Sequence, residues 1–228
     1  MRPGPPDWRQ YHDLIRQTLR GDECVVDVGC GDGAVRPFPW ERYPRVRLVG
    51  LDVDPAAAAN PALDEFHRLD ARAPWPVEAG AADVVLARYV LEHVAEPETF
   101  ALNLERALKP GGSFVFLTPN RRHPAMAVSR ALPVEWKRRI LRRTRGVDES
   151  DVFPTFYRMN TPRRLRELFE MAGLRVERLD TREFEPCGYL EFAAPAYALA
   201  CGWYSLLRRT GLERLLGAQI LGVVRKPL

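Results

Sequence analysis

Three glycines spaced by one residue follow an apolar run that carries an acid, in Val25-Val26-Asp27-Val28-Gly29-Cys30-Gly31-Asp32-Gly33. Glycine reaches positive φ at little steric cost and leaves no Cβ between the main chain and a ligand. In an open α/β sheet, ligands usually bind where such a strand ends. The stretch therefore predicts a buried strand that breaks into a ligand-binding turn.

Two cofactors fit this turn. Gly29, Gly31 and Ala34 satisfy the dinucleotide pattern G-x-G-x-x-G/A, and Asp52 follows at about the spacing expected of a ribose-binding acid. S-adenosylmethionine (SAM) shares the ribose but carries an ammonium, a carboxylate and a sulfonium instead of a pyrophosphate. Asp27, at the end of the strand, would oppose the ammonium and the sulfonium and would repel a pyrophosphate. The motif favours SAM and leaves a nicotinamide dinucleotide open.

Further motifs follow in a fixed order. They are Arg47–Pro55, His67–Ala71, Ala82–Arg88, Leu91–Val94, Leu108–Leu117 with Pro110-Gly111-Gly112, and Arg158–Val176. In this order the chain resembles the class I SAM-dependent methyltransferases, particularly the methyltransferase type 11 branch that contains ubiquinone- and menaquinone-biosynthesis enzymes. The resemblance covers about residues 20 to 185. It is more specific than the glycine turn alone.

The resemblance implies that the glycine turn holds the methionine side of SAM. The residues concerned are Asp27, Gly29, Cys30, Gly31 and Gly33.

The resemblance also implies roles at the ends of the next strands. Asp52 looks like the ribose acid, with Val53 against the adenine. Asp70 looks like the partner of the adenine amino group, with Ala71 beside it, and Arg88 lines the inner edge of the cofactor. A structural alternative stays open for both acids, since an Asp after a strand often caps a helix or a turn.

Two histidines are candidates for a general base. An oxygen nucleophile must lose its proton, and the pKa of histidine suits that step near neutral pH. His93 lies just past the fourth predicted strand and His123 follows the fifth, both at the ligand edge. The alternative for His93 is a structural or substrate-lining role. His12 and His67 have only ordinary surface or strand positions.

Tyr11 and Tyr157 are expected to reach the pocket from flanking segments and line the substrate. We therefore expect a SAM-dependent methyltransferase, with S-adenosylhomocysteine (SAH) as product and no metal. It would act on an oxygen or nitrogen of a small-molecule metabolite, lipid-like or a natural product. The alternatives are a non-catalytic SAM-fold binding module and a Rossmann oxidoreductase of the NAD type.

Periodicity and turn residues predict the elements that position these groups. Strands are expected at about 24–28, 46–51, 65–69, 83–87, 112–117, 174–184 and 218–225, and helices at about 8–20, 97–108 and 162–172. The fold class is α/β, and the resemblance implies a Rossmann-like, seven-stranded, mostly parallel sheet with helices on both faces and the last strand antiparallel. Pro37, Pro39 and Pro44 predict a short or irregular helix after the glycine turn.

The length fits a single methyltransferase domain over 1–228. It would comprise an N-terminal helix at 1–20, a basic insertion at 119–160 after strand 5, and an apolar helical insertion at 185–215 after strand 6. Insertions at strand ends are where a shared fold acquires its particular substrate. The acceptor is therefore expected to meet these two insertions.

The net charge of +4 conceals a local excess, because Arg121–Gly146 holds nine Lys or Arg and one acid, which leaves −4 for the remainder. A basic excess confined to one segment argues against nucleic-acid binding. Segment 121–146 is expected to be a solvated basic helix, and apolar segment 189–207 a helix over the active site or a dimer contact. Peripheral membrane contact through both segments stays open, as does the choice between monomer and homodimer.

Cellular location is inferred from cysteines and the N-terminus. Cys24, Cys30, Cys187 and Cys201 lack C-x-x-C spacing and are expected to be reduced. The first residues, Met1–Asp7, lack the apolar core of a signal peptide. Both observations lead us to expect a cytoplasmic protein.

Overall fold

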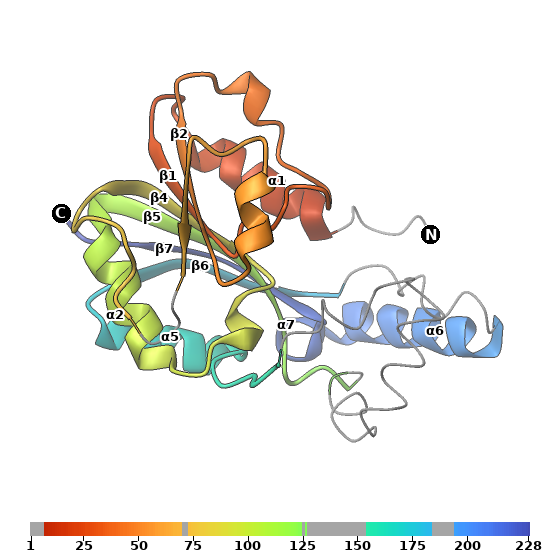
Figure 1. Ribbon diagram of the computed structural model, residues 1–228. Helices are drawn as coiled ribbons and strands as arrows, with labels where there is room; N and C mark the ends of the chain where they lie inside the picture. The colour runs from red at the N-terminus through yellow and green to blue at the C-terminus, as the bar shows by residue number, and fades with distance from the viewer. Residues whose placement is uncertain (1–6, 70–72, 125, 127–153, 184–193) are drawn as a thin grey trace.

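The computed structural model describes residues 7–69, 73–124, 126, 154–183 and 194–228, and its centre is a seven-stranded sheet (Figure 1). The strands are β1 (Cys24–Val28), β2 (Arg47–Asp52), β3 (Glu65–Arg68), β4 (Ala82–Arg88), β5 (Leu108–Pro119), β6 (Arg175–Arg182) and β7 (Gln219–Arg225). Their order is β3-β2-β1-β4-β5-β7-β6. Strands β1 to β5 pair in parallel, and β7 is antiparallel to both β5 and β6. The expected fold class is confirmed.

Helices pack on both faces of this sheet. α1 (Asp7–Thr18) covers one face, while α2 (Pro97–Ala107) and α5 (Pro162–Met171) cover the other (Figure 1). The amphipathic pattern of α1 turns Tyr11, Leu14 and Ile15 into a core with strand residues such as Val84 and Leu117. Because both faces are covered, the middle strands are buried along most of their length, as their apolar sequences predicted.

The segment after the glycine turn has no α-helix. Between β1 and β2, only the 3-10 helix η1 (Trp40–Arg42) forms, with Pro39 immediately before it. Proline lacks the N–H that a helix interior needs, so Pro37, Pro39 and Pro44 prevent a longer helix. Phe38 from this segment is buried against the α1 side of the sheet instead. The expectation of a short or irregular helix is confirmed.

The other expected elements lie within a few residues of their predicted bounds, except that β5 begins at Leu108 instead of 112. Leu108 already pairs with Ala82 of β4, and the Gly111 N–H donates to the Lys226 carbonyl at 2.9 Å. Thr161 caps α5 as predicted, because its side chain accepts from the Arg164 N–H. Most of the basic insertion, residues 127–153, lies outside the described residues.

The apolar insertion contains α6 (Ala194–Thr210) and the short α7 (Glu213–Leu216). The helix expected at 189–207 therefore runs to Thr210, and its first predicted residues lie outside the described residues. Arg182 and Pro119 both pair with Gln219, so the insertion leaves the sheet at the carboxyl edge of β5 and β6. The glycine turn that follows β1 lies at the same edge.

Candidate active site

The glycine turn has the backbone that its sequence predicts. Gly29, Gly31 and Gly33 adopt φ angles of 70°, 54° and 76°, in the region that favours glycine. The Gly29 N–H donates to the Leu51 carbonyl of β2 at 2.7 Å. The turn is thus fixed to the end of the neighbouring strand before it leaves the sheet.

The three glycines are required for two different reasons. A Cβ on Gly29 would overlap Cγ2 of Val90, and one on Gly33 would come within 2.6 Å of Oδ1 of Asn60. A Cβ on Gly31 would meet nothing within 4 Å. The first and third glycines therefore make room for protein, while Gly31 presents bare backbone to open space. A ligand can approach the main chain there.

Asp52 organises the turn from the end of β2. It is only 9% exposed; its Oδ2 accepts from the Gly31 N–H at 2.9 Å, and its Oδ1 accepts from the Asp54 N–H at 2.9 Å. Asp54 in turn caps the 3-10 helix η2 (Pro55–Ala59) by accepting from the Ala56 N–H. The helix-cap alternative considered for Asp52 belongs to Asp54, and the Asp52 carboxylate lies beside the open space at Gly31.

Asp27 lies in β1, two residues before Gly29, and its pKa is far from the usual value of an aspartate. Burial, opposed by the Arg88 guanidinium and reinforced by the Asp52 carboxylate, raises the pKa of Asp27 to about 7. Asp27, Gly29, Gly33 and Arg88 all line a cavity of about 60 Å³. This volume is far below that of a nucleoside site, so the cavity by itself could not hold SAM. A cation arriving at the turn would favour the ionised form of Asp27.

Arg88 connects the end of β4 to the segment after the glycine turn. Its guanidinium donates to the carbonyls of Val35 at 2.7 Å and Arg36 at 2.9 Å. Arg36 has a φ of 48°, an unfavourable value for a residue with a side chain. The two hydrogen bonds fix the backbone of this proline-rich segment, which has no α-helix of its own to do so.

Tyr11 and His12 of α1 line the same cavity as Asp27. Tyr11 is 4% exposed and belongs to the core between α1 and the sheet. The surface or strand position expected for His12 is wrong, since His12 is 3% exposed and lies edge-on to the rings of Trp8 and Phe38. Burial, followed by the charges of Arg88 and Arg16, lowers the pKa of His12 to about 4. It is a neutral wall of the site.

The remaining cofactor candidates lie in three settings. Cys30 turns its thiol toward β2, because a Cβ on Gly50 would come within 2.8 Å of its Sγ. Burial raises the pKa of that thiol to about 12, so it stays neutral. Val53 is 39% exposed just beyond Asp52, where an apolar side chain could cover a base. Asp70 and Ala71 lie outside the described residues.

Asn60 is a site residue that the sequence did not reveal. Its Nδ2 donates to the carbonyls of Gly31 at 3.1 Å and Cys30 at 3.4 Å, and its Oδ1 accepts from the Ala62 N–H. Asn60 is 9% exposed and lies at the C-terminal end of η2, so its two hydrogen bonds fix the glycine turn to that end of the helix. An Asn before Pro61 reads as an ordinary turn residue, so the sequence carries no signal for this role.

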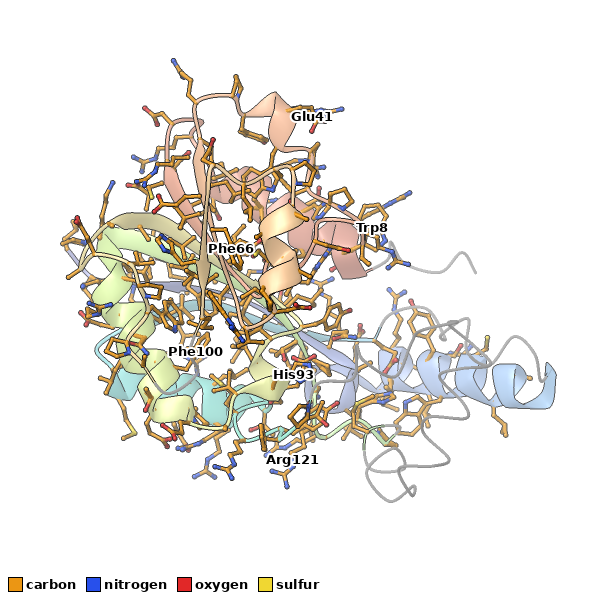
Figure 2. The ribbon with its side chains drawn as sticks, viewed as in Figure 1. Trp8, Glu41, Phe66, His93, Phe100 and Arg121 are labelled. Carbon is orange, nitrogen blue, oxygen red and sulfur yellow. The ribbon has the colours of Figure 1, made fainter. Side chains whose placement is uncertain are left out.

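His93 lies in the 3-10 helix η3 (Leu91–His93), which follows β4 and appears below α1 in the view of Figure 2. Its Nδ1 lies 2.9 Å from the Pro154 carbonyl. A carbonyl only accepts, so Nδ1 carries the proton and Nε2 carries the lone pair in the neutral ring. In that tautomer Nε2 is the ring nitrogen that can accept a proton. Tyr157 lies beside η3, because its N–H donates to the Glu92 carbonyl.

His123 lies in a different setting from His93. Its Nε2 is 3.1 Å from Oε2 of Glu183, and the two side chains are only 12% and 9% exposed. Glu183 lies directly after β6, so this contact joins the segment after β5 to the segment after β6. The contact suits a bridge between the starts of the two insertions.

Glu92 is a second residue that the sequence did not single out. It is 5% exposed, and its Oε2 accepts from the Thr118 hydroxyl at 3.0 Å. That hydroxyl also lies 2.6 Å from the side-chain amide of Asn160. Burial raises the pKa of Glu92 to about 7, although the bond from Thr118 opposes the shift. The network joins the ends of β4 and β5 to the start of α5.

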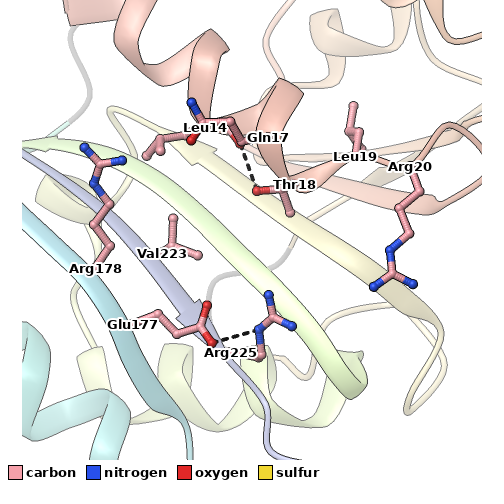
Figure 3. Close-up of a pocket in the computed structure, with 9 residues that line it drawn as sticks. All are labelled: Leu14, Gln17, Thr18, Leu19, Arg20, Glu177, Arg178, Val223 and Arg225. Atoms are coloured by element: carbon pink, nitrogen blue, oxygen red, sulfur yellow. Dashed lines mark hydrogen bonds and ion pairs between the residues drawn. The ribbon is translucent and has the colours of Figure 1, made fainter.

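A larger cavity, of about 330 Å³, lies at the amino edge of the sheet, between the end of α1 and strands β6 and β7 (Figure 3). Glu177 and Arg225, which form an ion pair at 3.0 Å, are among its lining residues. Ligands of open α/β sheets bind at the carboxyl edge, so we assign the active site to the glycine turn and not to this cavity.

Comparison with known proteins agrees with the geometry. A family described as methyltransferase domain matches residues 4–179. A probable SAM-dependent methyltransferase of Mycolicibacterium smegmatis is 33% identical over 50% of this chain and 46% of its own length. A ubiquinone biosynthesis O-methyltransferase of Maricaulis maris is 36% identical over 49% of this chain and 46% of its own. The chain spans about half the length of these curated relatives.

The fold is also found among solved structures. In a complex of the Haloferax volcanii Trm112 methyltransferase activator with a methyltransferase, the matched chain has a TM-score of 0.60 and 22% identity, over 97% of this chain and 92% of that one. At this identity the likeness concerns the fold alone.

Proposed function

The chain belongs to the class I SAM-dependent methyltransferase family, and on that premise we propose that it moves a methyl group from SAM to an oxygen or nitrogen of a small-molecule acceptor. The observation that carries the proposal is the open space at Gly31. There the backbone is bare, at a φ of 54°, between the ends of the strands that bear Asp27 and Asp52. Two carboxylates near one ligand position favour a cationic cofactor over a diphosphate.

The residues of the turn fit SAM. Each Asp52 oxygen accepts one backbone N–H, and a carboxylate offers about four acceptor positions, so lone pairs remain for the ribose hydroxyls. Asp27 would oppose the positive charge on the methionine side. SAM supplies a methyl group on a sulfonium, so its leaving group already carries the activation. The chain has to hold the acceptor in line with that methyl, and positioning of this kind can contribute about 7–11 kcal/mol.

For an oxygen acceptor, we assign the base to His93. The Pro154 carbonyl holds the proton at Nδ1, so Nε2 can take the proton of an acceptor hydroxyl. The Maricaulis maris relative is an O-methyltransferase, which supports oxygen as the acceptor atom. Tyr157 lies next to this histidine and Tyr11 lies across the glycine turn on α1, so we propose that both face the acceptor.

Titration calorimetry with SAM, SAH and NAD tests the assignment. SAM and SAH should bind and NAD should not; NAD binding without SAM binding would overturn it. Gly31→Ala should weaken SAM binding by about tenfold or more, because its Cβ enters the space reserved for ligand. Gly80→Ala is the matched control, since Gly80 has a φ of 65° and also has nothing within 4 Å of an added Cβ. Equal loss in both variants would indicate backbone strain alone.

A further inference from the structure

α6 extends past the carboxyl edge of the sheet and away from the rest of the domain (Figure 1). It is joined to the domain at its C-terminal end, where it packs against α7. Asn120, at the end of β5, donates to the carbonyls of Leu215 and Gly217 and so fixes the end of α7. The helix is therefore attached firmly at its base and projects from it.

The projecting helix exposes large apolar side chains. Leu199 is 76% exposed and Leu206 is 50% exposed. They are seven residues apart, so they lie two turns apart on one face of the helix. Leu212 and Leu215, each 44% exposed, continue the apolar surface onto α7. Large exposed apolar side chains grouped on one element can mark an interaction surface.

Charge is arranged along the helix in two blocks. The fourteen residues 194–207 contain no charged side chain, and exposed Arg208, Arg209 and Arg214 follow. The one acid among these residues is Glu213, whose carboxylate accepts from the Glu183 N–H. An uncharged helical stretch of this length is too short for a bilayer core of about 30 Å, but it suits an interfacial segment. In the part of the chain that the structure describes, no helix has the length and apolar character to cross a membrane.

We propose that α6 and α7 bind the surface of an anionic membrane. Leu199 and Leu206 enter the boundary between headgroups and acyl chains, and the three arginines at 208, 209 and 214 face the lipid phosphates. The three exposed arginines place positive charge at one end of this apolar face, and this charge is complementary to lipid phosphates, so we choose an anionic membrane as the occupant. The glycine turn opens at the same edge of the sheet, which brings the active site close to the membrane surface. The binding itself does not depend on methyl transfer.

Co-sedimentation of the full chain with vesicles tests this without any turnover assay. The chain should sediment with phosphatidylglycerol vesicles more than with phosphatidylcholine vesicles, and added salt should release it. A double variant, Leu199→Glu with Leu206→Glu, should lose about tenfold or more of the binding. The matched control is Leu102→Glu with Met171→Glu, which charges two residues that are 61% and 77% exposed on α2 and α5. The control should bind as the wild type does.

A second variant separates charge from apolar contact. Arg209→Gln with Arg214→Gln should weaken binding to phosphatidylglycerol by about fivefold for each arginine and leave the thermal melting curve unchanged. The proposal is overturned if the wild type fails to bind phosphatidylglycerol at low salt, or if the two double glutamate variants lose binding equally. Light scattering would also overturn the proposal if the wild type is a dimer and the Leu199→Glu with Leu206→Glu variant is a monomer, because the face would then bind a second copy.

Discussion

The pH dependence of SAM binding offers a quantitative test of the role of Asp27. Burial raises the pKa of Asp27 to about 7 in the ligand-free chain. A cationic ligand needs the ionised form, so SAM affinity should fall as the pH falls through that value. A carboxyl with this pKa is about one-tenth ionised at pH 6 and about three-quarters ionised at pH 7.5. The dissociation constant for SAM should therefore be about eightfold larger at pH 6 than at pH 7.5.

Calorimetry across this interval measures the effect directly. Asp27→Asn should bind SAM more weakly at pH 7.5 and should lose the pH dependence, because the amide does not titrate in this range. Asp22→Asn is the matched control, since Asp22 is an exposed acid just before β1, at the far end of the same strand. A constant wild-type affinity from pH 6 to 7.5, or the full dependence retained in Asp27→Asn, would refute the reasoning.

Three further changes probe the rest of the site. Asp52→Ala should weaken SAM binding by about tenfold or more, because it removes ribose acceptors and the bond to the turn, whereas Asp54→Ala should not; calorimetry compares them. His93→Gln should lower the rate of methyl transfer from labelled SAM about a hundredfold while SAM affinity stays within about twofold; retained turnover would demote His93 to a structural role. Glu92→Gln should raise the melting temperature more at pH 8 than at pH 5.5. Because the pKa of Glu92 is raised to about 7 in the folded chain, folding stability falls as the pH rises toward that value, by about 3 kcal/mol in total. An equal gain in melting temperature at both pH values would contradict this.

The backbone shape of the glycine turn was largely predictable because its determinants are local. Gly29, Gly31 and Gly33 are spaced by one residue along the chain, and their positive φ angles are ones that glycine adopts at little steric cost. Asp52 was found because the end of a neighbouring parallel strand is a fixed place in this fold. The same local reasoning placed Thr161 as the cap of α5 and predicted a short or irregular helix from the three prolines.

The residues that were missed depend on contacts between distant segments. Asn60 reaches back about thirty positions to the carbonyls of the glycine turn. Glu92 meets Thr118 and Asn160 only once β4, β5 and α5 have assembled. His12 was assigned to the surface because helical periodicity does not tell which polar residue on the boundary of an apolar face will be covered, and Phe38 covers it here.

The acceptor half of the site converges on η3. The Glu92 carbonyl accepts from the N–H groups of both Phe156 and Tyr157, and His93 Nδ1 lies 2.9 Å from the Pro154 carbonyl. Residues 154, 156 and 157 lie near the end of the basic insertion at 119–160, so the insertion is fastened, where it returns to the domain, to the same three-residue helix that carries the candidate base. The Glu92 side chain is bonded to Thr118 at the end of β5, whereas the Glu92 carbonyl and His93 are bonded to the insertion. A change in the path of the insertion should therefore alter the position of His93 relative to the glycine turn. Substrate choice and proton transfer would then be coupled through η3, so insertions of different length could present different acceptors to one cofactor site.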